Sequence, residues 1–229
     1  AVRAALLDLD LPAWEEIRFK PEFSPWKGED LPFSASFFAP GSIYNRSVAV
    51  NLVEDGVITP LALTPEMFDF GAAVPPGKLE GETIPCAGFA LAHLPAFPAT
   101  PRDLAAFLGA TYFRAKGKDS VFGVSARGLA LNTALPEGEE FPYFREFWLV
   151  KPSANDTAFT LFALMDSPSM AGAYAFVITP GTSVAVETRC RLFPRHGAAQ
   201  PAKIGLAAMN SMFLMAEGAE NTGGKAPFD

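Results

Sequence analysis

Phe107–Trp148 reads FLGATYFRAKGKDSVFGVSARGLALNTALPEGEEFPYFREFW, and it is the most informative stretch of the chain. Glycines divide it into short strand-like pieces in which aromatic rings alternate with guanidiniums and carboxylates. Such a surface suits sugars, because rings stack on the apolar face of a pyranose while polar side chains hydrogen-bond its hydroxyls. The alternative is that the rings are core and the charges face solvent. The pattern predicts short strands and leaves both interpretations open.

Short strands are also predicted on both sides of this stretch. Upstream, Leu31–Ala39 and Ser47–Val53 alternate, and Glu54-Asp55-Gly56 before Val57 predicts a hairpin turn because Asp-Gly readily takes positive φ. From residue 111 onward the predicted strands are Thr111–Ala115, Ser120–Ser125, Gly128–Asn132, Phe144–Val150, Ala158–Met165, Ala171–Ile178, Thr182–Phe193 and Lys203–Met215. Turns at this spacing are typical of an all-β fold, so the sequence predicts an antiparallel β-sandwich with short helical insertions.

The strand predicted at Thr182–Phe193 shows the clearest division into two faces. Glu187, Arg189 and Arg191 share one face, whereas Val186, Thr188, Cys190 and Leu192 share the other. This alternation predicts a half-buried strand in an antiparallel sheet.

Three short helices are expected. Pro12 suits the first turn of a helix that carries Trp14. Thr64-Pro65 signals a helix start that lasts about one turn, and Thr100-Pro101 repeats that signal. Thr100–Gly109 is the clearest predicted helix, with Asp103 in its first turn to suit the helix dipole.

Composition bounds the class of protein. The chain has 229 residues, 49% hydrophobic residues and 21 phenylalanines, which indicates a packed globule rather than disorder. Its formal net charge is −7 and it lacks basic runs, so neither nucleic acid nor an anionic membrane is an expected partner. No apolar run is long enough to insert into a membrane.

The termini and cysteines allow two further expectations. The chain begins without the apolar segment of a signal peptide, which we interpret as a mature or trimmed start. Cys86 and Cys190 are too few to define a disulfide framework, so two buried thiols are expected, with a bridge left open.

No motif for a metal, cofactor or nucleophilic catalytic centre is present. His93 and His196 stand outside any HxxxH or HExxH context, and neither cysteine belongs to a CxxC pair. Ser125 lies in VSARG rather than in a GxSxG turn. The glycines form no phosphate-binding loop, and the spacing of the carboxylates picks out no acid–base pair. We therefore expect no metal, no cofactor and no catalytic residue.

Several long segments resemble, in order, the periplasmic glucan biosynthesis proteins G and D. They are DLDLPAWEEIRFKPE, TPEMFDFG, FLGATYFRAKG, VFGVSARGLALNT, GEEFPYFREFW, ALMDSPSMAGAYAF and SMFLMAEG. The resemblance runs from near Asp8 to the end of the chain. It implies a galactose-mutarotase-like β-sandwich, followed in the family by an immunoglobulin-like domain that is absent here. Residues 1–229 would then form a single β-sandwich domain that is incomplete at its C-terminal end.

The resemblance also implies a function. Family members take part in making osmoregulated β-1,2-glucans in the periplasm of Gram-negative bacteria, so β-1,2-glucan or a gluco-oligosaccharide, and the membrane-bound glucan synthase machinery, are the implied partners. Some members resemble inverting β-1,2-glucanases, whose aspartates are expected beyond the end of this chain. Whether the protein trims or branches glucan is therefore left open. The alternatives are a non-catalytic module that binds glucan or a protein partner, and a mutarotase-like epimerase, for which the two histidines offer little support.

Six residues are the candidate sugar contacts. Tyr112 and Trp148 are the candidate platforms for a sugar ring. The candidates for hydroxyl contacts are Arg114, Arg127, Glu140 and Arg145. The alternatives are that Arg145 forms a buried ion pair with Glu139 or Glu140, and that Trp148 belongs to the core.

Overall fold

The computed structural model describes residues 2–72, 74–75, 77–94 and 101–209, with side chains from residue 5 onward. Two short α-helices and two 3-10 turns punctuate fifteen strands. The helices are α1 Val2–Leu7 and α2 Leu11–Glu15, and the 3-10 turns are η1 Pro21–Phe23 and η2 Pro65–Met67. The strands are β1 Arg18–Phe19, β2 Phe33–Phe38, β3 Ala49–Glu54, β4 Val57–Pro60, β5 Phe68–Asp69, β6 Gly88–His93, β7 Arg102–Leu108, β8 Tyr112–Ala115, β9 Ala126–Arg127, β10 Leu129–Leu131, β11 Tyr143–Val150, β12 Phe159–Asp166, β13 Met170–Thr179, β14 Ala185–Pro194 and β15 Ile204–Leu206.

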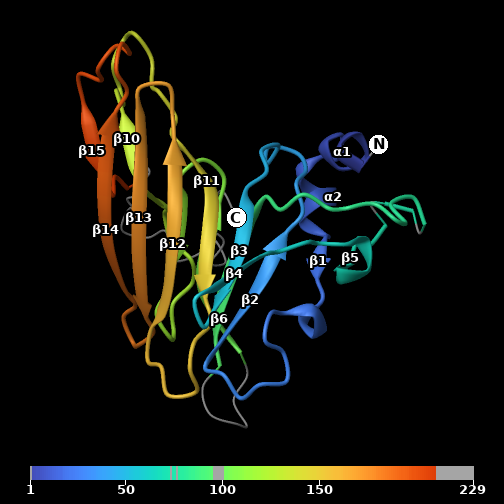
Figure 1. The fold of residues 1–229 in the computed structure, drawn as a ribbon. Coiled ribbons are helices and arrows are strands. Elements are labelled where there is room, and N and C mark those ends of the chain that lie inside the picture. The colour runs from blue at the N-terminus through green and yellow to red at the C-terminus, as the bar shows by residue number, and fades with distance from the viewer. Residues whose placement is uncertain (1, 73, 76, 95–100, 210–229) are drawn as a thin grey trace, which may run out of the picture.

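Two large sheets pack face to face, which confirms the predicted all-β sandwich (Figure 1). The six-stranded sheet has the order β14-β13-β12-β11-β3-β4, and the five-stranded sheet has the order β2-β6-β7-β8-β9. The β10–β15 ribbon continues the second sheet, because the Gly128 N–H donates to the Thr111 carbonyl and Ala126 bridges to Met209. The small β1–β5 ribbon lies beside α2 at the other side of the molecule.

Aromatic rings fill the space between the sheets. Phe147 of the six-stranded sheet lies 5.0 Å from Phe89 and 5.7 Å from Phe107, both in the five-stranded sheet (ring centroids). Phe107 in turn lies 5.2 Å from Phe176 of β13. These four side chains are at most 2% exposed. Because truncating such a ring to alanine typically costs about 3–5 kcal/mol, this aromatic layer is a main source of the stability of the sandwich.

One strand pairing departs from the expected antiparallel pattern. β3 and β11 run parallel, with Phe147 opposite Val50, whereas every other strand pair is antiparallel in the part of the chain that the structure describes. A parallel pair needs a long crossover rather than a tight turn. Here the crossover contains β6, β7, β8 and β9 of the second sheet, which lie between β4 and β11 in the chain, whereas β2 precedes β3. β3 and β11 therefore both begin at the same end of the sandwich.

Several local predictions are confirmed. Asp55 and Gly56 both have positive φ (48° and 77°) in the hairpin between β3 and β4, as a tight turn of this kind requires. Asp10 caps α2 by accepting a hydrogen bond from the Ala13 N–H at 2.9 Å, and Pro12 lies in the first turn. The turn expected after Thr64 is η2, although the Thr64 side chain makes no capping hydrogen bond.

The helix predicted at Thr100–Gly109 is wrong. Residues 102–108 form β7, which pairs with β6 on one side and β8 on the other; Thr100 lies outside the described residues. The pairing shifts register between Leu91 and Ala92, so that Leu104 has no partner of its own and both Leu104 and Ala105 are buried. This β-bulge produces two adjacent apolar positions, which in the sequence resemble helical spacing.

Two further predictions need correction. Ser120–Ser125 is not a strand but irregular backbone between β8 and β9, interrupted by Gly123. β6 is a strand that the sequence does not predict, because Gly88 and Phe89 are both buried and interrupt the alternation of buried and exposed positions. The strand expected at Lys203–Met215 is reduced to β15 within the described residues, and residues 210–215 lie outside them.

β14 is more exposed than the half-buried strand that its sequence predicts. Thr188 and Cys190 pair with the buried Phe176 and Tyr174, so they belong to the inner face, yet both are exposed. On β15, Ile204 and Leu206 pair with the buried Leu131 and Leu129 but are 47% and 64% exposed. The two sheets are therefore uncovered along this side, at the left of Figure 1.

The prediction of two buried thiols is right for one cysteine only. Both cysteines are free, but Cys86 is buried and Cys190 is exposed on β14. Burial raises the pKa of the Cys86 thiol to about 12, although its hydrogen bond to the Gly88 carbonyl opposes that effect. Cys86 is therefore a neutral core side chain at neutral pH.

Candidate functional site

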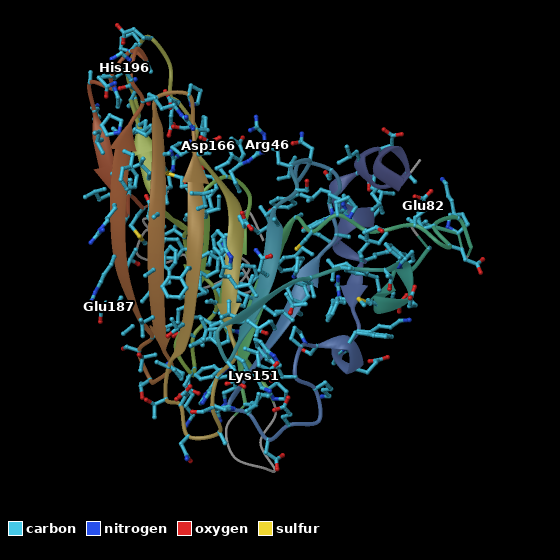
Figure 2. The ribbon with its side chains drawn as sticks, in the orientation of Figure 1. Arg46, Glu82, Lys151, Asp166, Glu187 and His196 are labelled. Atoms are coloured by element: carbon cyan, nitrogen blue, oxygen red, sulfur yellow. The ribbon has the colours of Figure 1, made fainter. Side chains whose placement is uncertain are left out.

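The main pocket lies at one end of the sandwich and has a volume of about 690 Å³. Its walls come from three segments that meet at that end: residues 43–48 before β3, the turn from β7 to β8, and the start of β11. Figure 2 shows Arg46 at this upper end, near the end of β12 marked by Asp166, whereas Lys151 lies at the lower end. The parallel β3–β11 pairing is what brings the first and third segments together.

Ten of the 23 residues that line the pocket are aromatic. Phe107, Phe144 and Phe147 of the aromatic core are its deepest members, and all three are at most 3% exposed. Tyr112 and Tyr143 lie nearer the surface and are half-buried, and Arg46 covers one face of the Tyr143 ring. Partly exposed rings beside a dry core are a suitable platform for the apolar face of a sugar.

Three arginines line the same pocket. The Arg46 guanidinium carbon lies 3.8 Å from the centroid of the Tyr143 ring, which is a cation–π contact. Arg114 donates from Nε to the Ser125 hydroxyl at 2.8 Å, and Arg145 is exposed. Within residues 5–72, 74–75, 77–94 and 101–209, none of the three has a carboxylate within 4.0 Å.

Arg145 faces the pocket because β11 carries a bulge. The register with β12 shifts between Phe144 and Glu146, so Arg145 has no partner of its own in the ladder. An extra residue in one strand bends it and redirects a side chain. Phe144 on one side and Phe147 on the other stay in the core, while Arg145 joins the lining of the pocket.

Arg127 adjoins the pocket but is held by the fold. Its guanidinium forms an ion pair with Glu139, in which both side chains are less than one-fifth exposed. The Thr133 hydroxyl donates to the same carboxylate at 3.2 Å. The Arg127 guanidinium carbon also lies 5.2 Å from the Tyr112 ring and 5.7 Å from the Phe141 ring. Arg127 therefore supports Tyr112, which lines the pocket.

Glu140 and Trp148 lie away from the pocket lining. The Glu140 carboxylate accepts hydrogen bonds from the Ser169 N–H at 3.0 Å and the Ser169 hydroxyl at 2.8 Å, which ties it to the turn between β12 and β13. Burial raises the pKa of Glu140, but the hydrogen bonds from Ser167 and Ser169 outweigh it, so the pKa lies below its ordinary value. Trp148 alternates with the inward-facing Phe147 and lies opposite Phe162 on the outer face of the six-stranded sheet.

The structure thus brings together Tyr112, Arg114 and Arg145, with Arg127 behind them, and separates Glu140 and Trp148 from this group. The alternative of a buried ion pair between Arg145 and Glu139 or Glu140 is not found, since Glu139 pairs with Arg127 and Glu140 accepts hydrogen bonds from Ser169.

Sequence reasoning missed Tyr44, Arg46 and Tyr143. Tyr44 packs against Trp14 at 4.5 Å, and burial raises the pKa of its hydroxyl, an effect that Arg114 opposes and Glu15 reinforces. Tyr44 and Arg46 belong to a loop far from Phe107–Trp148 in the chain, and no local pattern marks them. Tyr143 lies inside that stretch, in the alternating run Tyr143-Phe144-Arg145, where ring and guanidinium types were the available signal.

Acidic residues and histidines are absent from the described lining of the pocket. No Asp or Glu is among the described residues that line the pocket. His93 lies at the far end of β6 against Phe33, while His196 follows β14 at the pocket end, so the structure does not pair them. Among the described residues there is no group of three potential metal ligands and no helix long and apolar enough to cross a membrane.

Comparisons with known proteins identify relatives of the chain. A family profile described as "Periplasmic glucan biosynthesis protein, MdoG" matches residues 1–226. "Glucans biosynthesis protein G" of Ralstonia nicotianae is 40% identical over 215 residues, which are 93% of this chain and 41% of that protein. The protein of the same name from Shewanella frigidimarina is 41% identical over 218 residues, or 95% of this chain and 38% of that protein. The chain thus spans about two-fifths of the length of the curated relatives it matches.

Proposed function

The chain belongs to the family of periplasmic glucan biosynthesis proteins, and from that membership we propose that it binds a β-1,2-linked glucan in the pocket at the end of its sandwich, in the periplasm. The proposed contacts are Tyr112 and Tyr143 as platforms for sugar rings and Arg114 and Arg145 as donors to hydroxyls. Tyr112 is a predicted contact that also lines the pocket.

The observation that carries this proposal is the combination of rings and guanidiniums in one cavity. A volume of about 690 Å³ falls within the range typical of small-molecule sites. The Arg127–Glu139 ion pair and the contact of Arg127 with Tyr112 hold one platform in place before a ligand arrives. A preformed platform lowers the entropy cost of binding, which supports recognition of a flexible glucan.

Trimming or branching of the glucan would need acids from elsewhere. Glycoside hydrolysis requires two carboxyl groups flanking the scissile bond, and the described lining of the pocket contains none. The relatives are more than twice as long as the matched segment. We therefore place binding in these residues and leave any cleavage to a longer polypeptide.

The exposed inner side chains of β14 and β15 support the expectation that residues 1–229 are one part of a larger β-sandwich domain. Ile204 and Leu206 lie on the core side of β15 and are nevertheless 47% and 64% exposed. Additional strands, for which the length of the relatives leaves room, would bury them.

A second candidate function is a module that docks a membrane-bound component of glucan synthesis. It is favoured by the outer face of the six-stranded sheet, where Phe162 and Leu164 are 44% and 41% exposed beside Trp148. Exposed apolar surface of this kind is typical of protein interfaces.

Calorimetric titration of the protein with β-1,2-linked gluco-oligosaccharides tests the proposal. We expect Tyr112→Ala to weaken binding about ten-fold or more, because it removes a stacking platform. Phe162→Ala is the matched control, since it removes an exposed ring from the outer face, and it is expected to leave binding unchanged. Absence of binding in the parent protein would reject the sugar pocket and leave docking as the remaining function. Equal effects of the two substitutions would reject this pocket as the site.

A further inference from the structure

The charged side chains that line the pocket are all positive. The chain as a whole carries a formal net charge of −7, with 25 acidic and 18 basic residues. The pocket is lined by Arg46, Arg114 and Arg145, and no Asp or Glu belongs to its described lining. A cleft walled by one sign of charge and by low-dielectric aromatic side chains concentrates ions of the opposite sign. The charge of the pocket lining is thus opposite in sign to the net charge of the chain.

The chemistry of the side chains points in the same direction. A neutral sugar hydroxyl both donates and accepts hydrogen bonds, so sites for neutral sugars need acceptors as well as donors. Each guanidinium offers five N–H donors and no acceptor. A carboxylate or phosphate group only accepts, and the arginine fork matches its geometry. The lining also contains neutral groups that accept hydrogen bonds, such as Asn45 and Ser47, but its charged side chains are all donors, which favours a ligand that carries an anionic acceptor.

The positions of the three arginines leave them available for such a group. Arg46 is held on the Tyr143 ring at 3.8 Å and Arg114 by the Ser125 hydroxyl at 2.8 Å, so two guanidiniums are positioned by uncharged groups. Arg145 is exposed on the bulge of β11. Glu15 on α2 is close enough to influence Tyr44, but it is not part of the lining. An incoming anion would therefore not have to displace a carboxylate of the described residues.

We infer that the ligand of this pocket is an anionic glycan, in which a carboxylate or phosphate group on a sugar meets Arg46, Arg114 and Arg145 while the ring stacks on Tyr112 or Tyr143. This inference rests on the proposed sugar-binding function and specifies the class of sugar. The anionic group supplies affinity through charge-assisted hydrogen bonds, and the rings select for the attached sugar.

The test compares matched ligands that differ only in charge. The ligands are a neutral β-1,2-linked gluco-oligosaccharide, the same oligosaccharide oxidised at a terminal C6 to a carboxylate, and the same oligosaccharide phosphorylated at that position. We expect at least one charged form to bind about ten-fold or more tightly than the neutral form at low salt. That advantage should shrink at high ionic strength, because salt screens the interaction. The stronger of the two charged forms identifies the group.

Two substitutions assign the effect to the pocket. Arg145→Gln should remove most of the advantage of the charged ligand, and it should weaken binding of the neutral ligand, for which Arg145 is a proposed hydroxyl donor, by a clearly smaller factor. Arg191→Gln on β14 removes the same charge from an exposed position outside the pocket lining and should change neither. Arg145→Lys keeps the charge but loses the fork, so an intermediate affinity is expected.

Each remaining outcome has a distinct meaning. Equal affinity for charged and neutral ligands would overturn the inference while the proposed function stands. Binding of none of them would overturn both. Binding of inorganic phosphate alone, as tightly as the phosphorylated sugar, would overturn the inference by showing a site for the anion without the sugar. If Arg191→Gln and Arg145→Gln lost the same amount of affinity for the charged ligand, the effect would come from the net charge of the protein. The inference would then be overturned.

Discussion

Arg127 and Arg145 lie at the same end of the sandwich, yet their surroundings differ. Arg127 is mostly buried, pairs with Glu139 and contacts the rings of Tyr112 and Phe141. Arg145 is exposed on a bulge and has no carboxylate partner among the residues that the structure describes. The first arrangement fixes a loop to the sheets, and the second leaves a guanidinium available to a ligand.

This difference extends to the neighbouring charges. Glu139 and Glu140 follow each other in the loop before β11, and each is held: Glu139 by Arg127 and Thr133, Glu140 by Ser169. Arg46 and Arg114 resemble Arg145, since uncharged groups position them and both face the pocket. We call Arg127, Glu139 and Glu140 the paired group, and Arg46, Arg114 and Arg145 the pocket group. Neighbouring charged residues can therefore have different roles: some hold the fold together, and others are available to a ligand.

The largest effect on stability is expected from Glu139→Ala. Both members of its ion pair are less than one-fifth exposed, and removing one partner leaves the other largely desolvated without its counter-charge. We expect the free energy of unfolding to fall by about 2 kcal/mol, measured by urea denaturation. Glu137→Ala, which removes an exposed carboxylate from the same loop, is the control and should cost less than about 0.5 kcal/mol. Equal effects of the two substitutions would remove Glu139 from the paired group.

A smaller, pH-dependent effect is expected from Glu140→Gln. The pKa of Glu140 lies below its ordinary value in the folded protein because the hydrogen bonds from Ser167 and Ser169 outweigh its burial. A carboxyl group with a lowered folded-state pKa stabilises the fold above its unfolded-state pKa of about 4.3, and this contribution disappears as the pH falls through the folded-state pKa. The substitution should therefore cost about 1 kcal/mol near neutral pH and less at about pH 3, because the stabilisation by the ionised carboxylate is lost as the pH falls.

The measurement is the free energy of unfolding of parent and variant at both pH values. Glu82→Gln, at an exposed position on the far side of the molecule, is the control and should show no such trend. A cost for Glu140→Gln that is the same at both pH values would mean that its ionised carboxylate does not hold the turn between β12 and β13. Glu140 would then leave the paired group.

The sequence predicted the fold better than the site because strand alternation is visible locally. β13 alternates buried and less buried positions along ten residues, and Asp55-Gly56 marks the hairpin between β3 and β4 without any knowledge of the rest of the chain. The failures occurred where burial depends on distant partners. β7 looked helical because a bulge opposite β6 buries Leu104 beside Ala105, and that bulge depends on the pairing of the two strands.

The candidate site could be predicted only in part, for a similar reason. Residue type selected rings and guanidiniums from one stretch, and that choice found Tyr112, Arg114 and Arg145. It could not separate Trp148 from them, since the alternation of β11 sends Trp148 to the face opposite Phe147. Nor could it find Arg46, which reaches the pocket because β3 runs parallel to β11 across a long connection. Long-range pairing carries this information, and no local pattern does.

The smallest effect on the free energy of unfolding is expected from Arg145→Gln. This small effect is the strictest test of the difference between the paired group and the pocket group. The Arg145 guanidinium is exposed and has no carboxylate partner among the described residues. The substitution therefore removes no ion pair from that part of the folded chain. Removal of the guanidinium should therefore change the free energy of unfolding by less than about 0.5 kcal/mol, measured in the same urea titrations as Glu139→Ala. A cost above about 1 kcal/mol would mean that Arg145 holds the bulge of β11 in place. In that case a loss of ligand affinity in the variant would no longer distinguish a ligand contact from a change in the pocket wall. Arg145 would then hold the fold, as the paired group does, and could not be assigned to the pocket group.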